Sequence, residues 1–180
     1  MLRIFLLKMF QKNTIGAEIG VWKGEFSKEI LRIVKPKEFH LIDPWKFQPE
    51  FGNRLYGGKI AKNQSDMDKI YFHILETFKN NPNIIVHRKF SHIASNIFKN
   101  EFFDWIYIDG NHYYDYVKMD LELYFPKVKK GGYLTGDDYF WSSPELGGDL
   151  PVKRAVNDFL KKGLVKKIKI LDGQYILQKI

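Results

Sequence analysis

Residues 14–24 read Thr14-Ile-Gly-Ala-Glu-Ile-Gly-Val-Trp-Lys-Gly24, and they carry the clearest indication of the fold class. Its apolar part, from Thr14 to Val21, is typical of a strand, and the glycines that close it predict a turn. A helical pattern follows from Glu25 to Val34. A strand, a glycine turn and a helix in this order indicate the first βα unit of a parallel sheet.

The rest of the chain repeats this alternation of strands and helices, and near its end two strand-like runs follow one another without a helix between them. A long irregular stretch runs from Trp45 to Asn63, and Ser65 is the expected cap of the next helix. The last two runs alternate in polarity around Asp172-Gly173, which is a strong hairpin signal. Strands are predicted at 38–42, 83–87, 103–108, 133–135, 165–171 and 174–179, and helices at 65–79, from 91, 114–125 and 152–161. We therefore expect an α/β, Rossmann-like fold with a mostly parallel seven-stranded sheet, a C-terminal antiparallel hairpin and helices on both faces.

Length and composition fit a single domain over residues 1–180. The 180 residues are 44% hydrophobic, 28% charged and 16% aromatic, which excludes wholesale disorder, and the lack of cysteine excludes disulfides and thiolate zinc sites. No apolar run approaches the roughly 20 residues of a membrane span, and the first residues lack a signal-peptide pattern, so we expect a cytoplasmic protein. The net charge of +8 permits an acidic partner, but its lysines are spread along the chain. A solvated basic surface is the preferred interpretation, no nucleic-acid partner is expected, and a homo-oligomer stays open.

The glycine turn and a later carboxylate together suggest a nucleotide-like ligand. Gly20 and Gly24 follow a strand, and the next helix begins with free N–H groups that can bind a carboxylate or phosphate. Asp43 ends the second strand, where nucleotide-binding α/β folds place the carboxylate that binds ribose hydroxyls. Glycines at a single turn of this kind often serve only the turn. The glycine turn and Asp43 together therefore indicate a nucleotide-like ligand more specifically than either feature does alone.

Two blocks of the chain resemble a known family. Gly16-Ala-Glu-Ile-Gly20-Val-Trp-Lys-Gly24 with His40-Leu-Ile-Asp43-Pro-Trp45 is similar to the class I S-adenosylmethionine-dependent methyltransferases. Tyr107-Ile-Asp-Gly-Asn-His112 and Lys130-Gly-Gly-Tyr-Leu-Thr-Gly-Asp-Asp138 resemble the small metal-dependent sugar O-methyltransferases related to macrocin O-methyltransferase. The similarity runs from about Ile15 to Phe159 and implies the class I methyltransferase fold.

The resemblance also implies an S-adenosylmethionine site. The implied cofactor residues are Glu18, Gly20 and Gly24 for the methionine part, Ser27 for its carboxylate, Asp43 for the ribose, and Ser91 with Phe90 for the adenine. The spacing between Gly24 and Ser27 differs by one residue from that in catechol-type methyltransferases. For both Ser27 and Ser91, helix capping is about as good an explanation as ligand contact.

Three carboxylates end neighbouring strands of the predicted sheet. Asp109 follows the fourth strand, and Asp137 and Asp138 follow the fifth, so they converge at the carboxyl edge where ligands bind. Their mutual repulsion favours a bound cation, and an all-oxygen set suits Mg²⁺, Mn²⁺ or Ca²⁺. We expect Mg²⁺, and the resemblance implies metal ligands at the same three positions. The alternative is that two of them only cap the following helices.

His112 stands three residues after Asp109 and is the predicted general base. A neutral imidazole near pH 7 can remove a proton from an acceptor hydroxyl, while a divalent cation stabilises the negative charge that develops on the oxygen. The other histidines are interpreted as structural. Aromatic residues are expected to border the acceptor site, with Trp141 as the foremost contact and Tyr139, Phe140, Tyr113, Tyr114 and Trp45 around it.

These features predict an S-adenosylmethionine-dependent O-methyltransferase that acts on a hydroxyl of a sugar or glycan-like small molecule with divalent-metal assistance. A catechol or phenol methyltransferase would use the same metal site. A basic nucleic-acid-binding protein is a second class, although no Asn-Pro-Pro-Tyr-type motif is present. A non-catalytic Rossmann-like domain would have no need for the acidic site.

Overall fold

A mixed sheet forms the centre of the molecule. The computed structural model describes residues 4–54, 60–142 and 147–180. Within them the strand order is β3-β2-β1-β4-β5-β7-β6, with β1 to β5 parallel and β7 antiparallel to both β5 and β6. This confirms the predicted fold class. The strands are β1 (Ile15–Ile19), β2 (Glu38–Asp43), β3 (Ile84–Arg88), β4 (Phe103–Ile108), β5 (Val128–Gly136), β6 (Val165–Leu171) and β7 (Gln174–Lys179).

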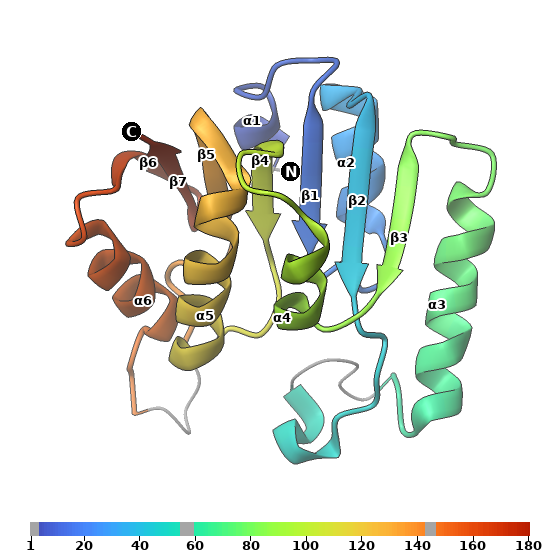
Figure 1. The fold of residues 1–180 in the computed structure, drawn as a ribbon. Coiled ribbons are helices and arrows are strands. Elements are labelled where there is room, and N and C mark those ends of the chain that lie inside the picture. The colour runs from blue at the N-terminus through green and yellow to red at the C-terminus, as the bar shows by residue number, and fades with distance from the viewer. Residues whose placement is uncertain (1–3, 55–59, 143–146) are drawn as a thin grey trace.

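Helices cover both faces of the sheet (Figure 1). One face carries α4 (Ser91–Ala94), α5 (Tyr114–Tyr124) and α6 (Pro151–Leu160), whose apolar side chains pack with those of the strands in one core cluster. The other face carries α1 (Ile4–Leu7), α2 (Glu25–Val34) and α3 (Gln64–Phe78), with a second cluster. Short 3-10 turns are η1 (Pro49–Arg54), η2 (Ser95–Ile97) and η3 (Phe125–Lys127).

Local sequence signals explain where the helices begin and end. Gly24 caps α2 with a left-handed φ of 77°, and the helix stops at Lys35, which is also left-handed and precedes a proline. The expected cap at Ser65 is wrong. The N-cap of α3 is Asn63, because its side chain accepts a hydrogen bond from the main-chain N–H of Asp66.

The fifth strand is longer than the sequence predicts. It begins at Val128 and passes through Gly131-Gly132, which were expected to precede it as a break. The register shifts between Phe103 and Trp105 of β4, so the glycines accommodate an irregularity inside the strand. A Cβ atom on Gly132 would lie 2.7 Å from the Asp104 carbonyl oxygen, which explains the need for glycine there. The two hairpin strands have the predicted bounds.

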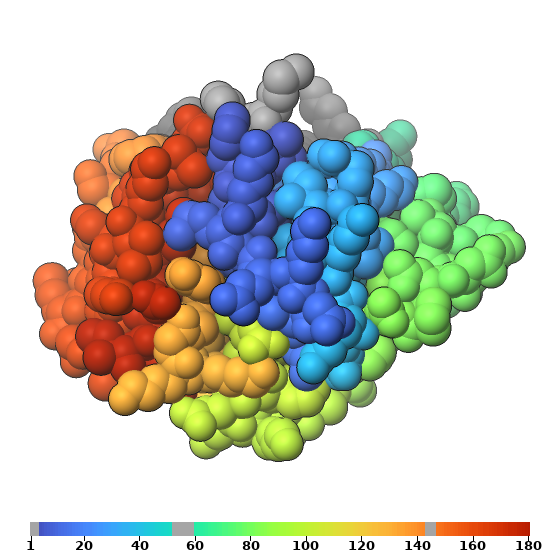
Figure 2. All heavy atoms as spheres, turned by 90° about the horizontal axis from the view of Figure 1, so that it is seen from above, coloured from blue at the N-terminus to red at the C-terminus, as the bar shows by residue number. Residues whose placement is uncertain are grey.

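The two ends of the sheet differ in character. At the end where the parallel strands begin, the blue N-terminal residues lie between the red C-terminal residues and the light-blue residues around α2 (Figure 2). The Phe10 and Trp105 rings stack there, with centroids 4.7 Å apart. The carboxyl ends of the strands, at the lower edge of Figure 1, carry the loops that surround a pocket. The fold therefore leaves the carboxyl end for ligand binding.

Candidate active site

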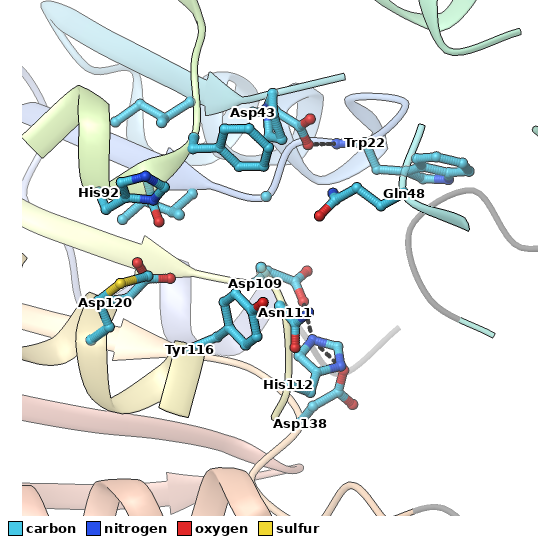
Figure 3. Close-up of a pocket in the computed structure, with 18 of the residues that line it drawn as sticks. Trp22, Asp43, Gln48, His92, Asp109, Asn111, His112, Tyr116, Asp120 and Asp138 are labelled. Atoms are coloured by element: carbon cyan, nitrogen blue, oxygen red, sulfur yellow. Dashed lines mark hydrogen bonds and ion pairs between the residues drawn. The ribbon is translucent and has the colours of Figure 1, made fainter. Parts of the chain in front are cut away.

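A pocket of about 670 Å³ lies at the carboxyl ends of β1 to β5. The loop after each of these strands contributes to its wall, and α5 closes one side. Of the predicted site residues, the pocket wall includes Gly20, Asp43, Phe90, Ser91, Asp109, His112 and Asp138. The wall also includes residues that the sequence analysis did not single out, among them Trp22, Gln48, Asn111 and Asp120 (Figure 3).

Gly20 lets the first loop pass directly beside the fourth. Its φ is 86°, and a Cβ atom there would lie 2.0 Å from the Asp109 carbonyl oxygen. Any side chain would therefore push the glycine loop away from the acidic residues. Gly24 has a different position, because a Cβ atom on it would meet Ile74 of α3 at 2.8 Å. It is not among the residues of the pocket wall.

Glu18 and Ser27 lie beneath this loop and not on the pocket wall. Both are buried, and the Ser27 hydroxyl donates a hydrogen bond to Oε2 of Glu18 at 2.5 Å. The structure therefore places Ser27 as a support for Glu18. Their contact with the methionine part of a cofactor stays a prediction.

Asp43 connects the first two loops. Its Oδ2 accepts hydrogen bonds from the main-chain N–H groups of Val21 and Trp22, each at 3.0 Å, and its Oδ1 accepts one from Trp45 at 2.8 Å. Burial raises the pKa of Asp43 to about 7, against the opposing effect of these three hydrogen bonds. Asp43 thus fixes the glycine loop and also lines the pocket.

Another wall of the pocket is formed by the start of α4 and by α5. The rings of Phe90 and His92 stack with centroids 5.6 Å apart, and both residues line the pocket next to Ser91. Met119 and Asp120 contribute to the wall from α5. The sequence analysis missed Asp120. A signal was available, because Asp120 lies on the same helical face as the buried residues Val117, Leu121 and Tyr124.

Asp109, His112 and Asp138 form a compact polar group on the other side of the pocket (Figure 3). Nε2 of His112 lies 3.5 Å from Oδ1 of Asp109 and 3.3 Å from Oδ2 of Asp138. One ligand atom from each residue falls within 4.8 Å of the others. Nε2 of His112 is buried and makes no hydrogen bond that satisfies distance and angle among the described residues. Two carboxylates that converge in this way fit a bound divalent cation, and the buried ring nitrogen of His112 lies beside them.

Asp137 is adjacent to this group but is not one of its three members. Its main-chain N–H donates to the Ile108 carbonyl oxygen at 3.1 Å, which continues the pairing of β4 and β5. Its charge nevertheless acts on the group. Burial lowers the pKa of His112, whereas the close polar contact and charge of Asp109 and the charges of Asp138 and Asp137 raise it, and the net effect is a raised pKa.

Aromatic side chains stand beside the polar group. The Trp141 ring meets the His112 ring edge to face at 5.5 Å and the Tyr113 ring at 5.9 Å. The centroid of the Phe51 ring, in η1, lies 6.1 Å from that of the Tyr113 ring and 5.7 Å from that of the Tyr116 ring. Trp141 and Tyr116 line the pocket, as does His112. These rings supply a flat apolar surface next to the polar group.

Three expected aromatic neighbours of the site lie elsewhere. Trp45 and Tyr139 are core residues, at 0% and 4% exposure, and the Tyr139 hydroxyl donates to Asn157. The Tyr114 hydroxyl donates to Asp158 of α6. The sequence pattern did not distinguish these core and interhelical positions from pocket positions, because each follows a strand end or opens a helix.

The sequence model of a family described as "Methyltransferase domain" matches residues 17–139. The match includes the glycine loop, Asp43 and the polar group. The chain belongs to this methyltransferase family. Membership supports an enzyme that uses S-adenosylmethionine as its methyl donor. The narrower resemblance to sugar O-methyltransferases is not decided by this match.

One sequence relative and several solved structures are similar to this chain. The chain is 26% identical over 144 residues to the uncharacterized protein R132 of Acanthamoeba polyphaga mimivirus, a match over 74% of the chain and 56% of that protein. The chain thus spans little more than half the length of this relative. A solved structure described as a caffeoyl-CoA O-methyltransferase from Staphylococcus aureus superposes with a TM-score of 0.67 at 17% identity, covering 99% of this chain and 81% of the other. The O-methyltransferase NovP gives 0.67 at 18% identity, covering 98% and 79%.

Among the described helices, none combines the length and apolar character needed to cross a membrane.

Proposed function

We propose that this methyltransferase transfers a methyl group from S-adenosylmethionine to a hydroxyl of a sugar or glycan-like small molecule, with the help of a divalent cation. The observation that carries the proposal is the convergence of Asp109, His112 and Asp138 in the pocket that also contains Gly20 and Asp43. Gly20 and Asp43, two of the cofactor residues that the resemblance implies, therefore line the same pocket as this group.

The proposed cation ligands are the carboxylates of Asp109, Asp138 and Asp137. Asp109 and Asp138 converge beside Nε2 of His112, and the charge of Asp137 is close enough to affect His112. An oxygen-rich set of this kind suits Mg²⁺. A bound divalent cation supplies positive charge that lowers the pKa of an acceptor hydroxyl.

His112 is the proposed general base. With acceptor and S-adenosylmethionine bound, Nε2 of His112 would take the proton of the hydroxyl, and the cofactor would supply the methyl group to the acceptor oxygen as its carbon–sulfur bond is lost. The products are the methyl ether, S-adenosylhomocysteine and a protonated His112. Asp109 and Asp138 stabilise the imidazolium, because both lie within ion-pair distance of Nε2. The methyl group is already activated by the sulfonium of S-adenosylmethionine, so the remaining contribution of the chain is alignment.

The aromatic residues support an acceptor with a flat face. Trp141 and Tyr116 line the pocket near His112, and such rings can stack on the apolar face of a sugar. The same surface also favours a second candidate, a catechol-type phenol. The Staphylococcus aureus structural neighbour carries caffeoyl-CoA in its name, which agrees with that alternative.

An acceptor comparison tests the proposal. Labelled methyl transfer from S-adenosylmethionine is measured to a methyl glycoside with neighbouring hydroxyls, to catechol and to a short RNA, each with Mg²⁺ or with excess EDTA. We expect transfer to the glycoside that requires Mg²⁺. Transfer to catechol alone would replace the sugar by the phenol class. Transfer to RNA alone, or transfer that EDTA leaves unchanged, would contradict the acceptor or the metal part of the proposal.

A further inference from the structure

Asp120 is a buried carboxyl group that the proposed mechanism does not use. It lies in the middle of α5, is 3% exposed and lines the pocket. Its Oδ1 is buried and has no hydrogen-bond partner among the described residues. A buried carboxyl oxygen without a donor is costly, so its retention in a pocket wall points to a ligand that supplies one.

The position of Asp120 separates it from the polar group that contains His112. Figure 3 shows Asp120 below His92, at the opposite side of the pocket from His112 and Asp138. The Ser91 hydroxyl interacts with the Asp120 carboxyl, and the Tyr124 hydroxyl donates to the Ser91 carbonyl oxygen at 2.8 Å. These contacts join α5 to the start of α4 and hold Asp120 against that wall.

The order of the strand ends assigns one part of the cofactor to this wall. The glycine loop after β1 faces the methionine part, and Asp43 after β2 faces the ribose, as the family resemblance implies. The next strand in the sheet is β3, followed by Phe90, Ser91 and His92. A nucleoside whose ribose lies at Asp43 then directs its base toward this wall. The base of S-adenosylmethionine is adenine, which carries an exocyclic amino group that donates hydrogen bonds.

We propose that the carboxyl group of Asp120 accepts a hydrogen bond from the exocyclic amino group of the cofactor's adenine and thereby selects adenine over 6-oxopurines. The proposal rests on the proposed function, because it takes S-adenosylmethionine as the ligand. A 6-oxopurine presents a carbonyl oxygen at the same place, which faces the carboxyl oxygens without a donor. Burial raises the pKa of Asp120 to about 7, so the comparison of the two bases is made at pH 8, where the ionised carboxylate offers acceptor atoms only.

A structural role is the competing explanation for Asp120. The buried hydroxyl of Tyr175 likewise has no hydrogen-bond partner within the part of the chain that the structure describes, and burial together with the charge of Asp120 raises the pKa of Tyr175. A water molecule between such groups would satisfy both without any cofactor. Substitution of Asp120 would then weaken every ligand of the pocket to the same degree. The ratio of two affinities is therefore more informative than either affinity.

The test measures the binding of S-adenosylhomocysteine and S-inosylhomocysteine by calorimetry. The inosyl compound differs only in carrying an oxygen where adenine carries its amino group. We expect wild-type protein to favour the adenine compound by at least about tenfold. Asp120→Asn should reduce this preference to less than about threefold, because an amide can turn either its oxygen or its nitrogen toward the base. Asp120→Leu should lose adenine affinity and the preference together.

Glu122→Gln is the matched control. Glu122 is exposed on the same helix and pairs with Lys162, so the preference should stay at its wild-type value. Equal binding of the two compounds by wild-type protein, or an unchanged preference in Asp120→Asn and Asp120→Leu, would overturn the assignment and leave the proposed function intact. Failure of wild-type protein to bind S-adenosylhomocysteine at all would contradict both.

Discussion

Nε2 of His112 lies 3.3 Å from Oδ2 of Asp138, although the two residues follow different strands. His112 belongs to the loop after β4, and Asp138 to the loop after β5, where it adopts a left-handed φ of 56°. A left-handed φ is uncommon for residues other than glycine. Parallel pairing of β4 and β5 thus places a ring nitrogen and two carboxylates around one point.

Cation affinity should depend on Asp138 more than on its neighbour Asp137. Asp138→Asn removes one of the two charges that face Nε2 of His112, so we expect at least about tenfold weaker Mn²⁺ binding in a titration followed by electron paramagnetic resonance. Asp137→Asn should give a smaller loss. The control Asp172→Asn changes an exposed residue of the hairpin and should bind as wild type does. Unchanged Mn²⁺ affinity in Asp138→Asn would remove it from the cation site.

Asp43 should contribute to both cofactor binding and stability. In Asp43→Asn, the amide nitrogen would face main-chain N–H donors that now meet a carboxylate oxygen. We expect S-adenosylhomocysteine affinity to fall at least about tenfold by calorimetry and the melting temperature to fall as well. Glu76→Gln on the exposed side of α3 serves as the control. Wild-type affinity in Asp43→Asn would exclude a ribose contact.

Asp120 should make stability fall as pH rises. Its pKa is about 7 in the folded protein against an ordinary 3.8, so the folded state keeps a proton that the unfolded state loses. The stability contributed by the protonated carboxyl is complete below the unfolded pKa and is lost as pH rises through the folded pKa. Asp120→Asn cannot ionise, so its free energy of unfolding relative to wild type should increase by about 2 to 3 kcal/mol between pH 5 and pH 8.

Urea denaturation of both proteins at the two pH values measures this difference. Asp172→Asn, which changes an exposed carboxylate, should show no comparable change. A constant difference between Asp120→Asn and wild type across this range would mean that Asp120 ionises normally.

Much of the fold could be predicted because its signals are local. The apolar run before Gly20 and the Asp172-Gly173 turn each specify one strand boundary through backbone preferences. The extent of β5 could not be predicted, since the passage of Gly131-Gly132 through the strand depends on pairing with β4. The cap at Asn63 depends on which side chain reaches the Asp66 N–H, and neighbouring polar residues compete for that role.

The candidate site was predictable where topology alone brings residues together. Asp109 and Asp138 converge because they end adjacent parallel strands. Side-chain direction was not predictable in the same way. Ser27 points to Glu18, and Asp137 lies outside the compact group, although each follows the same strand ends as its pocket-facing neighbours. The helical spacing of α5 indicates that Asp120 is buried, but its place on the pocket wall depends on how α5 packs, which the sequence does not show.

The most direct test of the account is the methyl-transfer rate of His112→Ala at saturating S-adenosylmethionine and Mg²⁺, with the best acceptor of the comparison above. His112 is the proposed proton acceptor, so kcat should fall by about 10² to 10⁴, while S-adenosylhomocysteine affinity stays within about threefold of wild type. His73→Ala, which changes an exposed residue of α3, should retain full activity. A near-wild-type kcat for His112→Ala at neutral pH would contradict the proposed role of His112 and, with it, the activation of the acceptor hydroxyl by the Asp109–His112–Asp138 group.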